Sequence, residues 1–405
     1  MSFTPSQKTL ERYADVLVNF AIGHGKGIKK GDVVRVVANE ATKPLYKEIR
    51  KAILKAGGHI IPFYQPDDTK ESNFSEDFFT LASEDQLSFF PKTYMKGLVD
   101  QVDHSITVWG DTYPEALKKA DPKKLLMHEK ARKHVYEWFF DKENKGKYSW
   151  TGALYGTEAM AKEAGLDLTE YWSQIIKACF LDETNPVAKW KQVDQEIKST
   201  AKKLDKLNIQ KVHLEGPDMS LDITIGDKRK WVSGGGANIP SFEIFTSPDW
   251  RGTNGRIKFN QPLYRYGNLI KGIELEFRDG IVVKSKAKKN EKLLKEMIAT
   301  EGANKVGEFS LTDTRFSRIT KFMAETLYDE NMGGPHGNTH IALGSSYHET
   351  YTGDRVKMKQ KDWQKLGFND SSVHTDIIST TPRTVTATLK NGTEKVIYKD
   401  GMFTV

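Results

Sequence analysis

A strand–helix–strand pattern near the N-terminus restricts the fold of this chain more than any other feature. The β-branched run V-V-R-V-V-A follows Gly31-Asp32 and predicts a short strand. Pro44 suits the first turn of a helix, Gly57-Gly58 suits its end, and a second strand is predicted over His59–Phe63. Strands joined by a helix of roughly 15 residues pair in parallel. The sequence therefore predicts an α/β fold in which helices cover a parallel sheet.

The rest of the first half continues this alternation. Apolar residues at helical spacing over Tyr13–Phe20 predict an opening amphipathic helix, and a long polar helix is predicted over Thr184–Leu207. We place the domain boundary near the end of that helix, which gives an N-terminal α/β domain over residues 1–205. The further elements predicted in this half are strands at Ser105–Trp109 and Trp150–Tyr155 and helices at Asp77–Phe90, Leu125–Phe139 and Leu168–Leu181.

After residue 205 the pattern changes to hairpins. Alternating strands flank the turn Gly216-Pro217-Asp218, and further hairpin turns are predicted at Arg278-Asp279-Gly280 and Asn391-Gly392. Helices are predicted at Asn290–Glu301 and Arg318–Leu327. The C-terminal domain, residues 206–405, is therefore predicted to be α+β with a largely antiparallel sheet.

Composition excludes several classes of protein. No apolar run approaches the roughly 20 residues that span a bilayer, and the N-terminus lacks the apolar core of a signal peptide. The single cysteine, Cys179, stands in an apolar sequence and is predicted to be a buried small residue. The 61 Lys and Arg are interspersed with 54 Asp and Glu, so the net charge of +7 does not indicate a nucleic-acid surface. We expect a cytoplasmic protein with neither a nucleic-acid nor a membrane partner.

The loop after the first strand is the one candidate ligand region of the first half. Asn39 and Glu40 stand where the strand ends, at the edge of the sheet where such folds often bind ligands. No glycine-rich phosphate loop accompanies them, so a nucleotide function has no motif support. At most, the sequence predicts a wall of a substrate pocket here.

Histidines concentrate in the second half. The chain has ten, and four of them lie among small and acidic residues between positions 336 and 374: His336, His340, His348 and His374. Imidazoles and carboxylates without thiols suit divalent Zn, Co or Mn. The alternative interpretation is a histidine-rich surface loop.

Two glutamates upstream strengthen the metal interpretation. Glu243 lies in a short segment bracketed by prolines, and Glu308 stands at the entrance to an apolar strand. His374 and Asp376 are two residues apart and would point to the same side of an extended segment. With His340 these residues offer five nitrogen and oxygen ligands, enough for two divalent ions that share a carboxylate. Two such ions activate one water and polarise a carbonyl in dinuclear hydrolases.

Four motifs carry a resemblance to a known family. They are N-I-P-S-F-E-I-F-T-S-P, the pair Gly307-Glu308, Y-D-E-N followed by H-I-A-L-G-S-S-Y, and H-T-D. The chain resembles the aminopeptidase T and aminopeptidase S family of bacterial metallopeptidases, the thermophilic metalloproteases. The similarity covers nearly the whole chain, from Glu11-Arg12-Tyr13-Ala14 onward. One position departs from the family pattern: Phe242 stands where the family has a glycine.

The resemblance implies a set of functional residues. Its active-site tyrosine corresponds to Tyr347, and Glu308 is expected to bridge the two metals and to take part in catalysis. The family is dimeric, so a homodimer is also expected. The implied metal ligands are Glu243, Glu308, His340, His374 and Asp376.

Several neighbouring residues are left outside this set. His336 precedes His340 by four residues, but the glycines and the proline around it disfavour the helix that would let both bind one metal. His348 directly follows Tyr347 and would point to the opposite face of an extended segment. Three acids could orient a ligand or act as the general base, and the sequence does not choose among them. They are Glu325, Asp329 and Glu330.

The sequence leads to one favoured hypothesis and two alternatives. The favoured one is an aminopeptidase that uses two divalent metal ions (Zn, Co or Mn) to hydrolyse the N-terminal bond of peptides. A dinuclear-metal phosphoesterase shares the same ligand set. A basic binding protein with structural histidines would instead bind its partner with a steep salt dependence and hold no stoichiometric metal.

Overall fold

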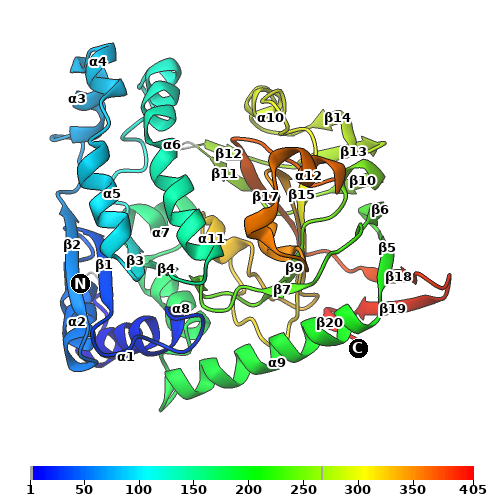
Figure 1. Ribbon diagram of the computed structural model, residues 1–405, viewed down its shortest axis with the longest axis horizontal. Coiled ribbons are helices and arrows are strands. Elements are labelled where there is room, and N and C mark those ends of the chain that lie inside the picture. Colours follow the sequence, from blue (N-terminus) through cyan, green and yellow to red (C-terminus); the bar gives the residue numbers. More distant parts are fainter. Residues whose placement is uncertain (1–2, 266–267) are drawn as a thin grey trace. The chain divides into compact units, whose positions relative to one another are not determined.

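The computed structural model describes residues 3–265 and 268–405 (Figure 1). They form two compact units. Unit 1 comprises the chain up to residue 191 together with residues 235–239, and unit 2 comprises residues 192–234 and 240–405. The first point of division and the domain boundary predicted at 205 both fall within one helix, α9 (Pro186–Lys206). The domain boundary itself stays a prediction.

Unit 1 is built on a five-stranded parallel sheet, as the strand–helix–strand pattern predicted. The strand order is β2-β1-β3-β4-β8, so the first strand lies inside the sheet. Every neighbouring pair is parallel, and the last strand comes from the short segment that returns to unit 1. The strands are β1 (Val33–Asn39), β2 (His59–Gln65), β3 (His104–Trp109), β4 (Ser149–Leu154) and β8 (Asn238–Ile239).

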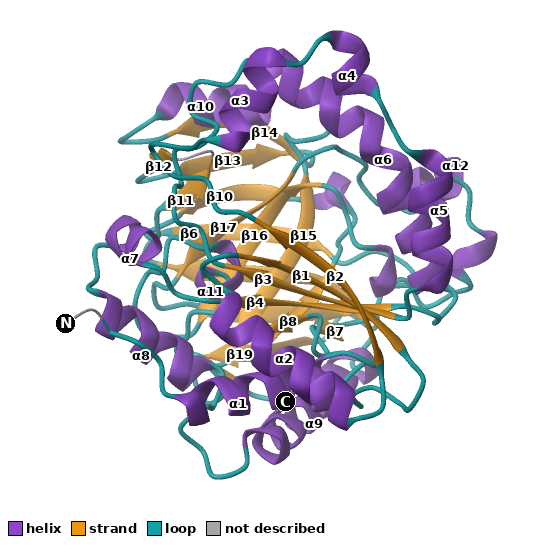
Figure 2. Cartoon of the chain, turned by 90° about the vertical axis from the view of Figure 1, so that its left-hand side faces the viewer, coloured by secondary structure: helices purple, strands orange, loops and turns teal. Residues whose placement is uncertain are grey.

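Helices cover both faces of this sheet (Figure 2). In β1, Val34 and Val36 are fully buried, and the strand packs with α2, which in turn contacts α1. On the other face, Arg35 places its guanidinium over the ring of Phe139 in α6. The helices are α1 (Gln7–Val16), the π-helix η1 (Leu17–Ala21), α2 (Lys43–Lys55), α3 (Phe74–Leu81), α4 (Glu84–Ser88), α5 (Lys92–Gln101), α6 (Pro122–Asn144), α7 (Glu158–Ala164) and α8 (Leu168–Ala178).

The single helix predicted over Asp77–Phe90 is wrong, because the chain forms two helices there. α3 ends at Leu81, and Ala82 is extended. Ser83 then starts α4. Its side chain accepts a hydrogen bond from the backbone amide of Gln86, and the side-chain oxygen of Gln86 accepts one from the backbone amide of Ser83. This reciprocal cap satisfies two backbone donors and favours a new helix start over a continuous helix.

Unit 2 is largely antiparallel, also as predicted. An eight-stranded sheet has the order β14-β13-β10-β6-β5-β18-β19-β20, and a five-stranded sheet has the order β17-β16-β15-β9-β7. The predicted hairpin turns lie between β13 and β14 and between β18 and β19. The strands of the eight-stranded sheet are β5 (Ile209–Gly216), β6 (Met219–Thr224), β10 (Asn254–Lys258), β13 (Glu274–Arg278), β14 (Ile281–Lys286), β18 (Thr384–Leu389), β19 (Glu394–Lys399) and β20 (Met402–Phe403).

The five-stranded sheet is the most deeply buried part of unit 2. Every residue of β9, β15 and β16 is buried. Its strands are β7 (Val232–Ser233), β9 (Glu243–Thr246), β15 (Val306–Thr312), β16 (Asn338–Gly344) and β17 (His374–Ser379). The other elements of unit 2 are the pair β11 (Leu263–Arg265) and β12 (Asn268–Ile270), helices α10 (Glu291–Ile298), α11 (Thr326–Asp329) and α12 (Gln360–Lys365), and the 3-10 turns η2 (Trp250–Gly252), η3 (His348–Thr350) and η4 (Arg355–Lys357).

The helix predicted over Arg318–Leu327 is wrong for most of its length, since only the four-residue α11 forms. The carboxylate of Asp329 accepts hydrogen bonds from the backbone amides of Met323 and Glu325 at 2.7 and 3.0 Å. Ala324 between them has a φ of 52°, outside the helical region. Side-chain capture of these amides competes with the bonds of a helix.

A small aromatic cluster packs directly after Tyr347. The imidazole of His348 stacks on Trp363 with ring centroids 3.9 Å apart and an angle of 5°. Phe368 and Tyr351 meet Trp363 edge-on. Burial, together with the positive charges of nearby arginines, lowers the pKa of His348 to about 4. The cluster therefore holds this imidazole neutral.

This environment predicts a stability effect that depends on pH. The folded-state pKa of His348 lies below its ordinary value near 6.5. The contribution of the neutral imidazole to the free energy of unfolding is therefore complete above pH 6.5 and is lost as the pH falls toward 4. We expect His348→Phe, which keeps an aromatic ring, to remove that loss. Between pH 7 and pH 5 the free energy of unfolding should fall less in the variant, by about 1–2 kcal/mol. Urea denaturation at both pH values measures this, and equal pH dependence would contradict it.

Candidate metal centre

The five-stranded sheet brings all five predicted ligands to one face. Glu308 on β15 and Asp376 on β17 both lie opposite Ala342 of the strand between them. His340 lies two residues from Ala342 and therefore projects from the same face. Glu243 pairs with Thr312, and His374 stands two residues before Asp376 as the first residue of β17. Ala342, whose side chain is a single methyl group, thus stands between the two acidic residues Glu308 and Asp376.

Three of these side chains converge in one group. The Nε2 atom of His340 lies 3.0 Å from Glu308 Oε1 and 3.2 Å from Glu243 Oε2. His340 is fully buried, Glu308 is 3% exposed and Glu243 is 8% exposed. Their ligand atoms lie close enough together to surround one metal ion.

A second group shares Glu308 with the first. The Nε2 atom of His374 lies 3.6 Å from Glu308 Oε2 and 3.4 Å from Asp376 Oδ1. Glu308 thus turns one carboxylate oxygen toward each imidazole. The arrangement contains two potential metal sites with one carboxylate in common.

Burial and charge shift the pKa values of these groups in opposite directions. Burial, reinforced by the nearby carboxylate of Glu243, raises the pKa of Glu308 to about 7. Burial alone would lower the pKa of His374, but the carboxylates of Asp376 and Glu308 outweigh it and raise that pKa to about 9. Burial likewise opposes ionisation of Asp376, yet the imidazoles of His374 and His340 bring its pKa down to about 2.

The group carries more negative charge than its own side chains can balance. Among the described residues, no lysine or arginine pairs with the carboxylates of Glu243, Glu308 or Asp376, whose ion-pair partners are the two imidazoles. Imidazole nitrogen and carboxylate oxygen are the ligands that Zn, Co and Mn accept. The residues present therefore fit divalent cations.

Two supporting contacts were not anticipated from the sequence. Ser310 donates a hydrogen bond to Glu243 Oε2 at 2.9 Å. The carbonyl of Ser345 lies 2.8 Å from Nδ1 of His374, which leaves Nε2 facing the carboxylates. Ser310 could have been found, because it follows Glu308 by two residues in a strand and must share its face. The Ser345 contact uses only the backbone and leaves no signal in the sequence.

Tyr347 lies beside the second group. Its ring centroid is 4.6 Å from that of His374 and 5.8 Å from that of Phe245, and 40% of the residue is exposed. The backbone amide of Tyr347 donates a hydrogen bond to the side chain of Ser247 at 2.8 Å. Partial burial and the surrounding carboxylates, Glu308 first, raise the pKa of Tyr347 well above 10. The phenol therefore stays protonated and can donate a hydrogen bond.

Within the described residues, the neighbouring acids and histidines lie outside the two candidate metal groups. Asp329 is engaged by the backbone of the loop before α11. Glu330 is buried, and burial followed by the charges of Glu243 and Asp376 raises its pKa well above the usual range. Its ionisation is therefore linked to the ligand group. In the described part of the chain, the candidate metal groups include neither His336 nor His348.

Phe242, directly before Glu243, anchors its segment to a neighbouring loop. Its side chain is fully buried, and its backbone amide donates to the side chain of Asn331 at 2.6 Å. Asn331 also donates to the carbonyl of Leu327 at 3.0 Å. The segment before Glu243 is thus fixed to the loop that carries Glu330.

Comparisons with known proteins identify the family and the fold. The chain is similar over 98% of its length to aminopeptidase AmpS of Bacillus subtilis (27% identical) and to aminopeptidase PepS of Streptococcus thermophilus (26% identical), and it covers 98% of each. A solved structure of wild-type AmpT from Thermus thermophilus matches 98% of this chain and 100% of its own, with 22% identity and a TM-score of 0.82, and so shows the same fold. The model of the thermophilic metalloprotease (M29) family matches residues 6–403. The chain therefore belongs to the thermophilic metalloprotease family.

Proposed function

We propose that the protein is an aminopeptidase that uses two divalent metal ions to hydrolyse the N-terminal bond of peptides. The observation that carries the proposal is the buried set of carboxylates whose ion-pair partners, among the described residues, are two imidazoles, arranged as two groups that share Glu308. Membership of a metalloprotease family and similarity to proteins named aminopeptidases support it.

Each proposed ion has its own set of ligands. Glu243 and His340 would hold one ion, His374 and Asp376 the other, and Glu308 would bridge them. Zn, Co and Mn all accept this donor set. When bound, two such ions lower the pKa of a shared water and polarise a carbonyl oxygen.

The side chains of the protein have distinct roles in this proposal. Tyr347 would donate a hydrogen bond from its phenol to the substrate carbonyl oxygen as negative charge develops on that oxygen. Glu330 would accept the proton of the attacking water in its ionised form, which bound cations would favour against the burial and the neighbouring carboxylates that raise its pKa. A free α-amino group offers a nitrogen ligand that an internal peptide bond lacks, which favours cleavage at the first residue.

Two expectations about the whole protein stay predictions. The family resemblance predicts a homodimer, and the composition predicts a cytoplasmic location. Within residues 3–265 and 268–405, no helix combines the length and the apolar character that crossing a bilayer requires.

Metal content and activity should change together. We expect two divalent ions per chain by elemental analysis, loss of aminoacyl-reporter hydrolysis after chelation, and recovery on adding Co or Zn. A phosphate-ester reporter should not be hydrolysed. Full aminoacyl activity in protein verified to be metal-free would disprove the proposal, and phosphate-ester turnover would favour a phosphoesterase.

Glu308→Ala should remove activity without unfolding the chain, because it deletes the carboxylate common to both groups. We expect kcat to fall by at least about 10³-fold and the metal content to fall below two ions per chain. Circular dichroism and thermal melting should still report a folded protein. His348→Phe is the control and should keep its activity, since His348 follows Tyr347 in sequence but packs in the aromatic cluster.

Tyr347→Phe should affect the transition state more than substrate binding. Loss of one hydrogen-bond donor to a developing oxyanion lowers kcat by about 10²–10³-fold, and KM should change little. Steady-state kinetics on a leucine reporter measure both values. Tyr351→Phe, a buried tyrosine in the neighbouring cluster, serves as the control. A change in KM alone would assign Tyr347 to substrate binding.

Ser310→Ala should weaken metal binding while the ligands remain. The variant loses the hydrogen bond that orients Glu243, and such supporting contacts contribute about 10–100-fold in metal affinity. Competition with a chromogenic chelator measures the affinity. Ser379→Ala replaces another buried serine of the same sheet that does not contact the ligands, and its affinity should equal that of the native protein.

A further inference from the structure

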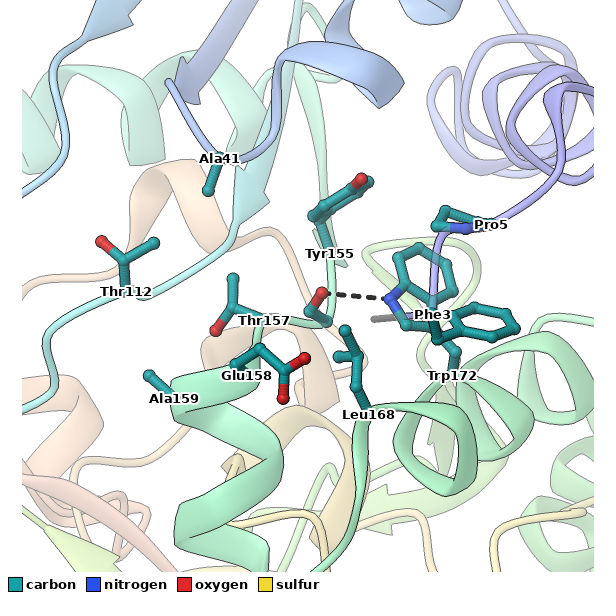
Figure 3. Close-up of a pocket in the computed structure, with 11 residues that line it drawn as sticks. Phe3, Pro5, Ala41, Thr112, Tyr155, Thr157, Glu158, Ala159, Leu168 and Trp172 are labelled. Atoms are coloured by element: carbon teal, nitrogen blue, oxygen red, sulfur yellow. Dashed lines mark hydrogen bonds between the residues drawn. The ribbon is translucent and has the colours of Figure 1, made fainter. Parts of the chain in front are cut away.

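Unit 1 contains a cavity of about 280 Å³ where strands of the parallel sheet end (Figure 3). Ala41 follows β1, Thr112 follows β3, and Tyr155 directly follows β4. These three strands are neighbours in the sheet, which brings the ends of strands that are far apart in sequence to one place. The region that the sequence indicated through Asn39 and Glu40 thus borders a cavity.

The polar groups of this lining are largely hydrogen-bonded within unit 1. The indole of Trp172 donates to the carbonyl of Gly156 at 3.0 Å, as the dashed line in Figure 3 shows. Thr112 donates to the carbonyl of Asp68 at 2.9 Å, and the hydroxyl of Thr157 also donates to a backbone carbonyl. Among the described residues, no lining side chain buries a polar atom that lacks a hydrogen-bond partner. A group of such atoms lies instead in unit 2, beside the candidate metal centre.

The two imidazoles of the metal centre differ in what their second nitrogen contacts. Nδ1 of His374 lies 2.8 Å from the carbonyl of Ser345. Nδ1 of His340 is buried and has no hydrogen-bond partner among the described residues. A histidine that binds a metal through one nitrogen almost always donates a hydrogen bond from the other, which fixes the orientation of the ring. The N–H group of His340 therefore requires an acceptor.

Two more unsatisfied polar atoms lie on the same face of the sheet. Thr312 of β15 directly opposes Asn338 of β16. Two residues away along each strand is the pair of Ser310 and His340, so all four side chains share one face. Thr312 and Asn338 are fully buried, as His340 is. The hydroxyl of Thr312 and Oδ1 of Asn338 each lack a hydrogen-bond partner within the described chain.

The orientation of the Asn338 amide is fixed by its neighbours. Its Nδ2 atom donates to the carbonyls of Glu330 and Met332, at 3.0 and 2.5 Å. Only the amide nitrogen can donate to a carbonyl, so Oδ1 is the atom that is left without a partner. The same side chain therefore holds the loop that carries Glu330, the acid proposed to accept the proton of the attacking water.

The three unsatisfied atoms are complementary as donors and acceptors. Nδ1 of His340 carries a hydrogen when Nε2 faces a cation, Oδ1 of Asn338 can only accept, and the hydroxyl of Thr312 can do either. None of them is hydrogen-bonded to another. A buried water typically makes about three hydrogen bonds to polar groups of this kind. One water can accept from His340 and donate to both Asn338 and Thr312.

We propose that Thr312 and Asn338 are positioning residues of the metal centre, which hold the imidazole of His340 through one shared buried water. The inference rests on the proposed two-metal function and extends it to residues outside the ligand set. The water fixes the ring so that Nε2 stays directed at Glu243 and Glu308, the carboxylates that lie 3.2 and 3.0 Å from it.

The two proposed ions should depend differently on this water. The carbonyl of Ser345 already orients His374, so the ion held by His374 and Asp376 needs no support from Thr312. The ion held by His340 does need it. Loss of the Thr312 hydroxyl should therefore weaken the binding of one ion and leave that of the other unchanged.

The first test is Thr312→Val, which replaces the hydroxyl by a methyl group and keeps the shape of the side chain. We expect one of two zinc ions to bind about tenfold more weakly, measured by competition of the zinc-loaded protein with a chromogenic chelator. Thr312→Ser keeps the hydroxyl and should bind both ions as the native protein does. In a His340→Ala background, Thr312→Val should cause no further loss, because the imidazole through which it acts is gone.

Thr375→Val is the matched control. Thr375 is also buried in the five-stranded sheet, and its hydroxyl also lacks a partner among the described residues. It stands between His374 and Asp376 in β17 and therefore points to the opposite face. Its zinc affinity should equal that of the native protein. Thermal melting checks that each variant is folded.

A high-resolution crystal structure of the native zinc-loaded protein tests the water directly. A water within hydrogen-bond distance of His340 Nδ1, Asn338 Oδ1 and Thr312 Oγ1 supports the proposal, and a direct contact of His340 Nδ1 with a protein atom would overturn it. So would native affinity in Thr312→Val, or an equal loss in Thr375→Val, while the native protein binds two ions. Native protein that binds no divalent metal would instead overturn the proposed function, and this inference with it.

Discussion

Negative charge buried inside a β-sheet is the constraint on which the second unit depends. Removing a carboxylate from water costs several kcal/mol unless a positive group compensates. Here Glu243, Glu308 and Asp376 have two imidazoles as ion-pair partners, and no lysine or arginine within the described chain pairs with them. Burial, and after it the neighbouring carboxylate of Glu243, raises the pKa of Glu308 to about 7. Divalent cations would compensate this negative charge, which links the energetics of the sheet to the proposed catalysis.

The regular geometry of strands accounts for the convergence of residues that are far apart in sequence. Alternate residues of a strand share a face, so each of four neighbouring strands needs only one or two suitable positions. Antiparallel register then sets Glu308 and Asp376 on either side of Ala342. A larger side chain than Ala342 would occupy the space between the two carboxylates. The small residue is thus as much a part of the arrangement as the charged ones.

The sequence predicted the two fold classes and the convergent residues because both follow from periodicity and motif. It failed where side chains compete locally with the backbone, as Ser83 does within the helix predicted over Asp77–Phe90 and Asp329 does after Arg318. It left Glu325, Asp329 and Glu330 undistinguished, since only the folded loop shows which carboxylate is linked electrostatically to the ligands. The cavity beside Ala41 depends on strand order, which periodicity does not contain.

The strand β8 has a consequence for how the chain can be divided. Its residues, Asn238 and Ile239, belong to unit 1 and pair with β4, although they lie far along the chain in the midst of the second unit. A fragment that stops at residue 191 would leave the β4 edge without this partner and open to pairing with another molecule. The native chain crosses between its units three times, so neither can be excised as one continuous segment. A fragment designed to isolate unit 1 must therefore keep residues 235–239 together with the chain up to residue 191.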